Sequence, residues 1–162
     1  MLSAEMVSTY GQRTRLRVMG LCWQNERLLL LNMGGLNAEN TLWIPPGGGV
    51  NFGEAAAQAV VREFKEETGL DVSVSRFCFA YEFINPVLHA LELFFEVALQ
   101  GGELTLGKDP ETTQNFLKTA EWIDETVFQE LKTSPHLLHG IFSHCSSLRD
   151  LQRLKGLLCS IN

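Results

Sequence analysis

The sequence predicts one α/β domain. Its 162 residues are 45% hydrophobic and 20% charged, which suits a single soluble domain with a sizeable core. Strand-length apolar runs lie on both sides of a segment at 54–68 that has the composition of a helix. Since no internal repeat, low-complexity tract or linker divides the chain, we expect one domain over residues 1–162.

Two strands and a glycine-rich loop are expected before the helix. The apolar runs at 16–23 and 28–33 are separated by Gln24-Asn25-Glu26-Arg27, which predicts an antiparallel hairpin. Residues 34–41 are predicted to form a loop. At 43–49 two prolines, which fix φ, precede three glycines, which permit unusual backbone shapes. Such a loop lets bare backbone approach a ligand closely.

The helix is expected over Glu54–Thr68 and is capped at its C-terminus by Gly69. At about 100° per residue, one apolar stripe faces the core. This stripe consists of Ala57, Val60, Val61 and Phe64.

Two long strands are expected after the helix, at 71–85 and 87–99, with a turn at Asn85-Pro86. The second strand alternates in character, which predicts two distinct faces. One face carries Leu91, Leu93, Phe95, Val97 and Leu99, and the other carries Glu92, Phe94 and Glu96. The remaining expected elements are a polar loop at 103–117, a short strand at 119–123, and helices near 124–132 and 146–158.

Three carboxylates crowd one side of the predicted helix. Relative to Glu63, Glu66 lies at about 300° and Glu67 at about 40°, so the three span about 100° and lie off the apolar stripe. At about 6 Å and an effective dielectric of about 20, each like-charge pair costs roughly 3 kcal/mol if it is partly buried, and only a few tenths of a kcal/mol if it is fully exposed. Arg62 offsets part of this cost, but hard oxygen ligands clustered in this way suit Mg²⁺ or Mn²⁺ better.

The surroundings of these acids favour a diphosphate site. Ala56 and Ala59 are small and lie one turn before the acids, which leaves room for a ligand, and the loop Gly47-Gly48-Gly49 brings backbone groups nearby. In such a site, cations neutralise phosphate oxygens and lower the pKa of bound water, while a carboxylate accepts the proton as hydroxide attacks phosphorus.

The segment 48–70 resembles a known motif. It matches every fixed position of the Nudix box, G-x5-E-x7-R-E-U-x-E-E-x-G-U. The matching residues are Gly48, then Glu54 after five residues, then, after seven more, Arg62-Glu63-Phe64-Lys65-Glu66-Glu67-Thr68-Gly69-Leu70. The resemblance implies a Nudix-type α/β/α sandwich with a mixed β-sheet. It also implies metal-dependent hydrolysis of the pyrophosphate bond in a nucleoside diphosphate linked to another moiety.

The resemblance also implies roles for individual residues. Glu66 and Glu67 become the principal metal ligands, and Glu63 becomes a further ligand or the base that activates water. Arg62 orients a box glutamate. The supporting positions are the box glycine Gly48, Glu54 beside the loop and the metal, and the carbonyl of Gly47 as a backbone ligand. Family members often draw a further acid from a late loop, for which Glu111 and Glu121 are the candidates.

The substrate remains open at this point. Members of the family specific for ADP-ribose often carry a proline about sixteen residues past the box, and Pro86 lies sixteen residues past Leu70. A proline that closes a hairpin explains the same residue. A nucleoside triphosphate is a comparable candidate substrate, and a nucleotide-sensing domain without catalysis is the alternative.

Several other polar and aromatic residues have simpler interpretations. We expect Glu82, Glu92 and Glu96 to form a polar outer face of the sheet rather than part of a metal site. The histidines His136, His139 and His144 lack accompanying zinc ligands, so surface or helix-end positions are expected. The aromatic residues in the strands are expected in the core. These are Trp23, Trp43, Phe77, Phe79 and Tyr81.

Charge and cysteine content limit the partners. Thirteen basic and nineteen acidic side chains give a net charge of −6, which disfavours nucleic-acid polymers and anionic membranes. A small nucleotide is therefore the expected partner, and a homodimer is a further candidate. The four cysteines are far apart and form no C-x-x-C pair, and no long apolar segment is present. We therefore expect a cytoplasmic protein with free thiols.

Overall fold

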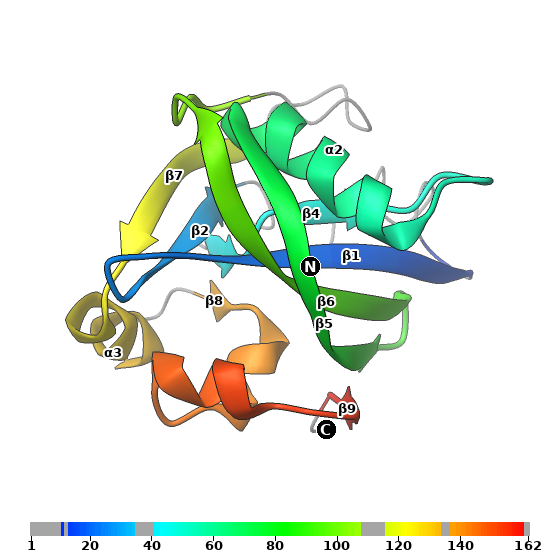
Figure 1. Cartoon of the computed structure of the whole chain (residues 1–162). Coiled ribbons are helices and arrows are strands. Elements are labelled where there is room, and N and C mark those ends of the chain that lie inside the picture. The colour runs from blue at the N-terminus through cyan, green and yellow to red at the C-terminus, as the bar shows by residue number, and fades with distance from the viewer. Residues whose placement is uncertain (1–10, 12, 35–40, 108–115, 134–136, 161–162) are drawn as a thin grey trace.

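A computed structural model describes residues 11, 13–34, 41–107, 116–133 and 137–160. Within these ranges the chain forms a mixed sheet in the strand order β8-β3-β2-β1-β6-β5-β9, in which β4 pairs with β1 and β7 pairs with β2 (Figure 1). The elements are β1 (Thr14–Gln24), β2 (Arg27–Met33), β3 (Leu42–Ile44), β4 (Gly47–Gly49), α2 (Ala56–Thr68), β5 (Leu70–Ile84), β6 (His89–Gly102), β7 (Leu117–Ile123), α3 (Glu125–Thr133), β8 (Leu137–Leu138), the 3₁₀-helices η1 (Gly140–His144) and η2 (Leu148–Arg153), and β9 (Leu157–Cys159).

The predicted N-terminal hairpin is confirmed. Strands β1 and β2 pair antiparallel, with Gln24 opposite Arg27. The two residues between them, Asn25 and Glu26, have φ values of 50° and 62°. Positive φ at both central residues matches the right-handed twist of the flanking strands. Of the loop expected at 34–41, residues 35–40 lie outside the described part of the chain.

Strands β5 and β6 form the long antiparallel pair that the sequence predicts. Their connection is held by the side chain of Asn85, whose Oδ1 accepts hydrogen bonds from the backbone N–H groups of Val87 and Leu88. Pro86 lies inside this turn, where its missing N–H is not required. Strand β6 also pairs with β1 in parallel, which makes the sheet mixed.

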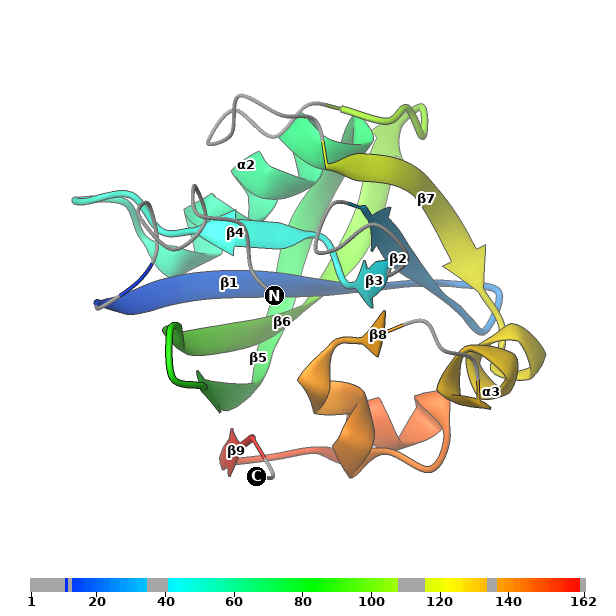
Figure 2. The ribbon, with the colours of Figure 1, turned by 180° about the vertical axis from the view of Figure 1, so that it is seen from behind.

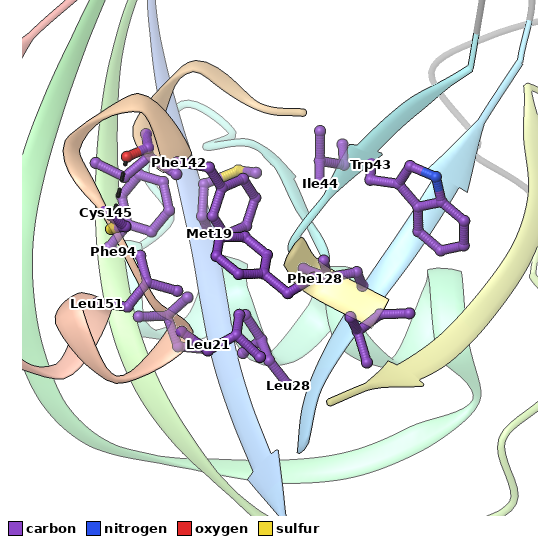
Figure 3. Close-up of a cluster of buried hydrophobic side chains, with 14 of the residues drawn as sticks. Met19, Leu21, Leu28, Trp43, Ile44, Phe94, Phe128, Phe142, Cys145 and Leu151 are labelled. Atoms are coloured by element: carbon purple, nitrogen blue, oxygen red, sulfur yellow. Dashed lines mark hydrogen bonds between the residues drawn. The ribbon is translucent and has the colours of Figure 1, made fainter. Parts of the chain in front are cut away.

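Helices cover both faces of the sheet, so the predicted α/β/α architecture is confirmed (Figures 1 and 2). One face packs against α2 through a cluster that includes Val18, Leu29 and Phe95. The opposite face packs against α3, η1 and η2. Figure 3 shows this second cluster, in which Met19 and Phe94 from the sheet meet residues of all three C-terminal helices.

The helix expected at 146–158 is wrong. The chain there forms η2, then a turn at Gly156 with φ 77°, and then strand β9, which pairs in parallel with β5. The apolar residues Leu148, Leu151 and Leu154 recur at every third position, which matches the three residues per turn of a 3₁₀-helix rather than an α-helix. The helix expected near 124–132 is present as α3.

The box helix α2 is shorter than predicted, and its buried face differs from the predicted stripe. It begins at Ala56 because the Glu54 carboxylate accepts a hydrogen bond from the N–H of Asn51, which keeps Glu54 in the preceding loop. Ala57 is exposed, whereas Val60 and Phe64 are fully buried. Gly69 has φ 70° and caps the helix as expected.

Among the described residues, no helix is long and apolar enough to cross a membrane.

Candidate active site

The glycines Gly47–Gly49, predicted as part of a loop, form strand β4, which pairs with β1 and lies beside α2. We call β4 the glycine strand. Arg17 lies opposite Gly49 in the β1–β4 pair, and Met19 lies opposite Gly47. A Cβ at Gly47 would lie 2.0 Å from the backbone carbonyl oxygen of Val18, so only glycine fits there. The glycine strand is therefore a fixed part of the sheet, next to the helix that carries the acids.

Arg62 connects the loop to three box carboxylates. Its Nε and Nη2 donate to the two carboxylate oxygens of Glu54, at 2.8 and 3.0 Å. Its Nη1 donates to Glu63 at 2.7 Å and to Glu66 at 3.1 Å. The same Nη2 also donates to the carbonyl of Gly49 at 2.9 Å. The role of Arg62 is thus wider than orienting one glutamate, and it uses the planar fork of the guanidinium.

The charges in this network reinforce one another. The hydrogen bond from Arg62 holds the pKa of Glu54 below its usual range, and burial opposes this effect only in part. In return, the hydrogen bonds to Glu54 and Glu63 raise the pKa of Arg62, although burial opposes the charged form. Both groups are therefore ionised over the whole physiological pH range.

Two of the three helix carboxylates are buried. This differs from the sequence-based expectation that all three lie off the apolar stripe of the helix. Glu63 and Glu67 are each 4% exposed. Glu67 accepts a hydrogen bond from the N–H of Gly47 at 2.8 Å. On the helix it lies only about 20° from the buried Val60, so it belongs to the edge of the apolar stripe rather than outside it. Glu66 is about one-third exposed, at 33%.

Gly48 allows Glu63 to lie against the loop. A Cβ at this position would lie 2.5 to 2.6 Å from the carboxylate atoms of Glu63. We therefore expect Gly48→Ala to displace that carboxylate and to lower turnover by about 10²-fold, as a misplacement of about 1 Å can do. Steady-state kinetics would measure the loss. The matched control is Gly101→Ala, because a Cβ at Gly101 meets nothing within 4 Å; equal activity of the two variants would contradict this reading.

The donor set fits a hard divalent cation. Carboxylate oxygens of Glu63, Glu66 and Glu67 and the carbonyl of Gly47 are the ligand types that Mg²⁺ and Mn²⁺ prefer. In the described part of the chain, no three acidic, histidine or cysteine side chains already stand in metal-binding geometry. Glu63 and Glu66 instead share the Nη1 of Arg62.

The candidate acids beyond the box are not brought to it by the described structure. Glu121 is exposed on β7 and accepts a hydrogen bond from Thr119. Its neighbour Trp122 packs into the cluster under α2, so Glu121 points to the opposite face of that strand. Glu111 lies outside the described residues.

Comparisons with known proteins identify the class. The NUDIX domain family model matches residues 13–139. The ADP-ribose pyrophosphatase of Methanocaldococcus jannaschii is 32% identical over 139 residues, which cover 85% of this chain and 72% of the relative. An uncharacterized Nudix hydrolase of Bacillus subtilis is 27% identical over 63% of this chain and 72% of its own length.

Solved structures share the fold. A MutT protein from Methanosarcina mazei superposes with a TM-score of 0.61 at 19% identity, over 86% of this chain and 91% of its own. An ADP-ribose pyrophosphatase from Streptococcus suis gives 0.59 at 20% identity, over 88% and 98%. The chain therefore belongs to the Nudix hydrolase family. It is a Nudix pyrophosphohydrolase, which cleaves pyrophosphate bonds in derivatives of nucleoside diphosphates, and enzymes of this family generally use divalent metal ions.

Proposed function

We propose that this enzyme hydrolyses ADP-ribose with Mg²⁺ or Mn²⁺. The observation that carries the proposal is the complete box, folded so that Arg62 joins its acids to the glycine strand. The choice of ADP-ribose is supported by the similarity to the pyrophosphatase of Methanocaldococcus jannaschii, which extends over 85% of the chain. Pro86, sixteen residues past the box, agrees with this choice.

Each site residue has a proposed role. Glu66 and Glu67 hold the cation, together with the carbonyl of Gly47. When bound, the cation supplies charge that neutralises the diphosphate and lowers the pKa of water. Glu63 accepts a proton from the attacking water. Arg62 and Glu54 keep the helix acids and the glycine strand in fixed relation, since Arg62 binds both.

The substrate proposal is tested by a panel of nucleotides assayed with Mg²⁺ and with Mn²⁺. ADP-ribose, several nucleoside triphosphates and a capped dinucleotide are compared by kcat/KM, and products are identified by chromatography. We expect ADP-ribose to yield AMP and ribose 5-phosphate with the highest kcat/KM. A nucleoside triphosphate that yields pyrophosphate with a higher kcat/KM would overturn the choice of ADP-ribose. Binding without product anywhere would instead favour nucleotide sensing.

The domain extent, compartment and ligand size of the enzyme are proposed from its charge and cysteines. We propose a single domain over residues 1–162 that acts in the cytoplasm on small nucleotides. The net charge of −6 supports a small ligand over a nucleic-acid polymer. The four cysteines are free, and three of them are buried, which suits a reducing compartment. A homodimer remains a candidate, which light scattering after gel filtration would measure.

A further inference from the structure

A buried charged cluster lies on the sheet face opposite α2. Glu92 of β6 is only 2% exposed. Its Oε1 accepts a hydrogen bond from Nη1 of Arg17 at 2.9 Å, and its Oε2 lies 2.7 Å from Nε2 of His139. The expectation that Glu92 forms a polar outer face is therefore wrong. Burial opposes its ionisation, but His139, Arg17 and Arg15 together lower its pKa to about 2.

His139 is oriented by two contacts. Its Nδ1 accepts a hydrogen bond from the backbone N–H of Ile141 at 3.2 Å, which caps the 3₁₀-helix η1. Because Nδ1 accepts, the ring proton is placed on Nε2, the nitrogen that lies 2.7 Å from Oε2 of Glu92. The ring also packs edge-on against Tyr81. His139 therefore occupies a helix end, as expected, but it is buried there.

The two partners of Glu92 support opposite ends of one active-site segment. The backbone N–H of His139 donates to the carbonyl of Trp43 at 2.9 Å, where β8 runs beside β3 (Figure 2). At the other end, the backbone of Arg17 pairs with Gly49. Between these two points lies the segment 43–49, which contains Gly47, the residue that donates to Glu67.

We propose that Glu92 is a positioning residue, which fixes the segment 43–49 against the box helix by holding Arg17 and His139 at once. The inference rests on the proposed role of the glycine strand and the box acids. Glu92 touches none of the proposed metal ligands; its effect passes through the backbone of β1 and of β8. Its neutral replacement by glutamine has one oxygen and one NH₂ group, so it can accept from only one of the two donors and faces the other with a hydrogen-bond donor.

The test compares Glu92→Gln with Glu96→Gln. The control makes the same change on the same strand, but Glu96 is one-third exposed and pairs with the exposed Arg76. For Glu92→Gln we expect a turnover about tenfold lower and a half-saturating Mn²⁺ concentration about tenfold higher, at the lower end of the range for residues that position metal ligands. The KM for ADP-ribose should change by less than about twofold, since uniform substrate binding is retained. Glu96→Gln should match the wild type.

Two further measurements keep the outcome decisive. Circular dichroism and thermal unfolding show whether each variant is folded, and Arg17→Lys, which keeps the charge, should shift Mn²⁺ saturation in the same direction by a smaller factor. A folded Glu92→Gln protein with turnover and Mn²⁺ saturation equal to those of the control would overturn the proposal. If the wild type itself does not cleave ADP-ribose, the substrate proposal fails. Direct Mn²⁺ binding, followed by electron paramagnetic resonance, then still reports on Glu92.

Discussion

Replacing Glu67, a proposed metal ligand, by glutamine is expected to lower turnover by about 10²- to 10³-fold, the range associated with removing one group that stabilises charge in the transition state. Glu67 is buried and lies against the glycine strand, and glutamine has nearly the same shape. Its amide oxygen can still accept from Gly47, so the fold should survive. The loss then reports on the negative charge of Glu67. Steady-state kinetics with saturating Mg²⁺ provides the measurement.

The control for this experiment is Glu130→Gln. Glu130 is exposed on α3, on the far side of the sheet from the box helix (Figure 1). Its substitution makes the same chemical change and should leave turnover within about twofold of the wild type. Thermal unfolding of both variants separates a catalytic loss from a folding defect. Unchanged turnover of the Glu67→Gln enzyme would overturn the assignment of the box acids.

Replacing Arg62 by alanine is expected to damage both stability and activity. The side chain makes hydrogen bonds to three carboxylates and to the carbonyl of Gly49. Its removal leaves Glu63 in a buried site without this charge partner. Because Arg62 is itself 26% exposed, we expect the free energy of unfolding to fall by about 2 kcal/mol, less than for a fully buried pair. Turnover should fall by about 10²-fold.

Two comparisons test the reason for this loss. Arg62→Lys keeps the charge but lacks the planar fork, so its stability and turnover should fall between those of the wild type and the alanine variant. Added Mg²⁺ should raise the unfolding midpoint of the alanine variant, since a ligand that binds only the folded state stabilises it. Urea denaturation measures the stability of each variant and the effect of Mg²⁺ on it, and steady-state kinetics measures turnover. An alanine variant as stable and active as the wild type would show that Arg62 does not organise the site.

Local patterns account for the parts of the fold that the sequence predicts. The hairpin around Asn25, the box helix and its cap at Gly69 all depend on residues close together in the chain. The helical spacing likewise brings Arg62, Glu63 and Glu66 together within about one turn of α2. The glycine strand precedes this helix closely in the chain and therefore lies nearby.

The remaining features depend on contacts between distant segments. The alternation along β6 predicts that Glu92 points outward, as Glu96 does. In the folded chain, however, η1 packs over that face and His139 lies against Glu92. Glu67 is buried because the glycine strand lies against α2. The periodicity of the helix alone carries no information about this neighbouring strand. The leucines of 148–154 fit a 3₁₀-helix as well as an α-helix, and the pairing of β9 with β5, which lies far away in the sequence, selects the 3₁₀-helix.

Binding of Mn²⁺ measured by electron paramagnetic resonance tests the central claim most directly. The box acids are proposed to hold a divalent cation, so the wild type should remove free Mn²⁺ from solution in a saturable way, and Mg²⁺ should compete. A folded protein with Glu66→Gln and Glu67→Gln combined should lose this binding, while Glu130→Gln keeps it. Equal Mn²⁺ binding by the double variant and the wild type would contradict the account.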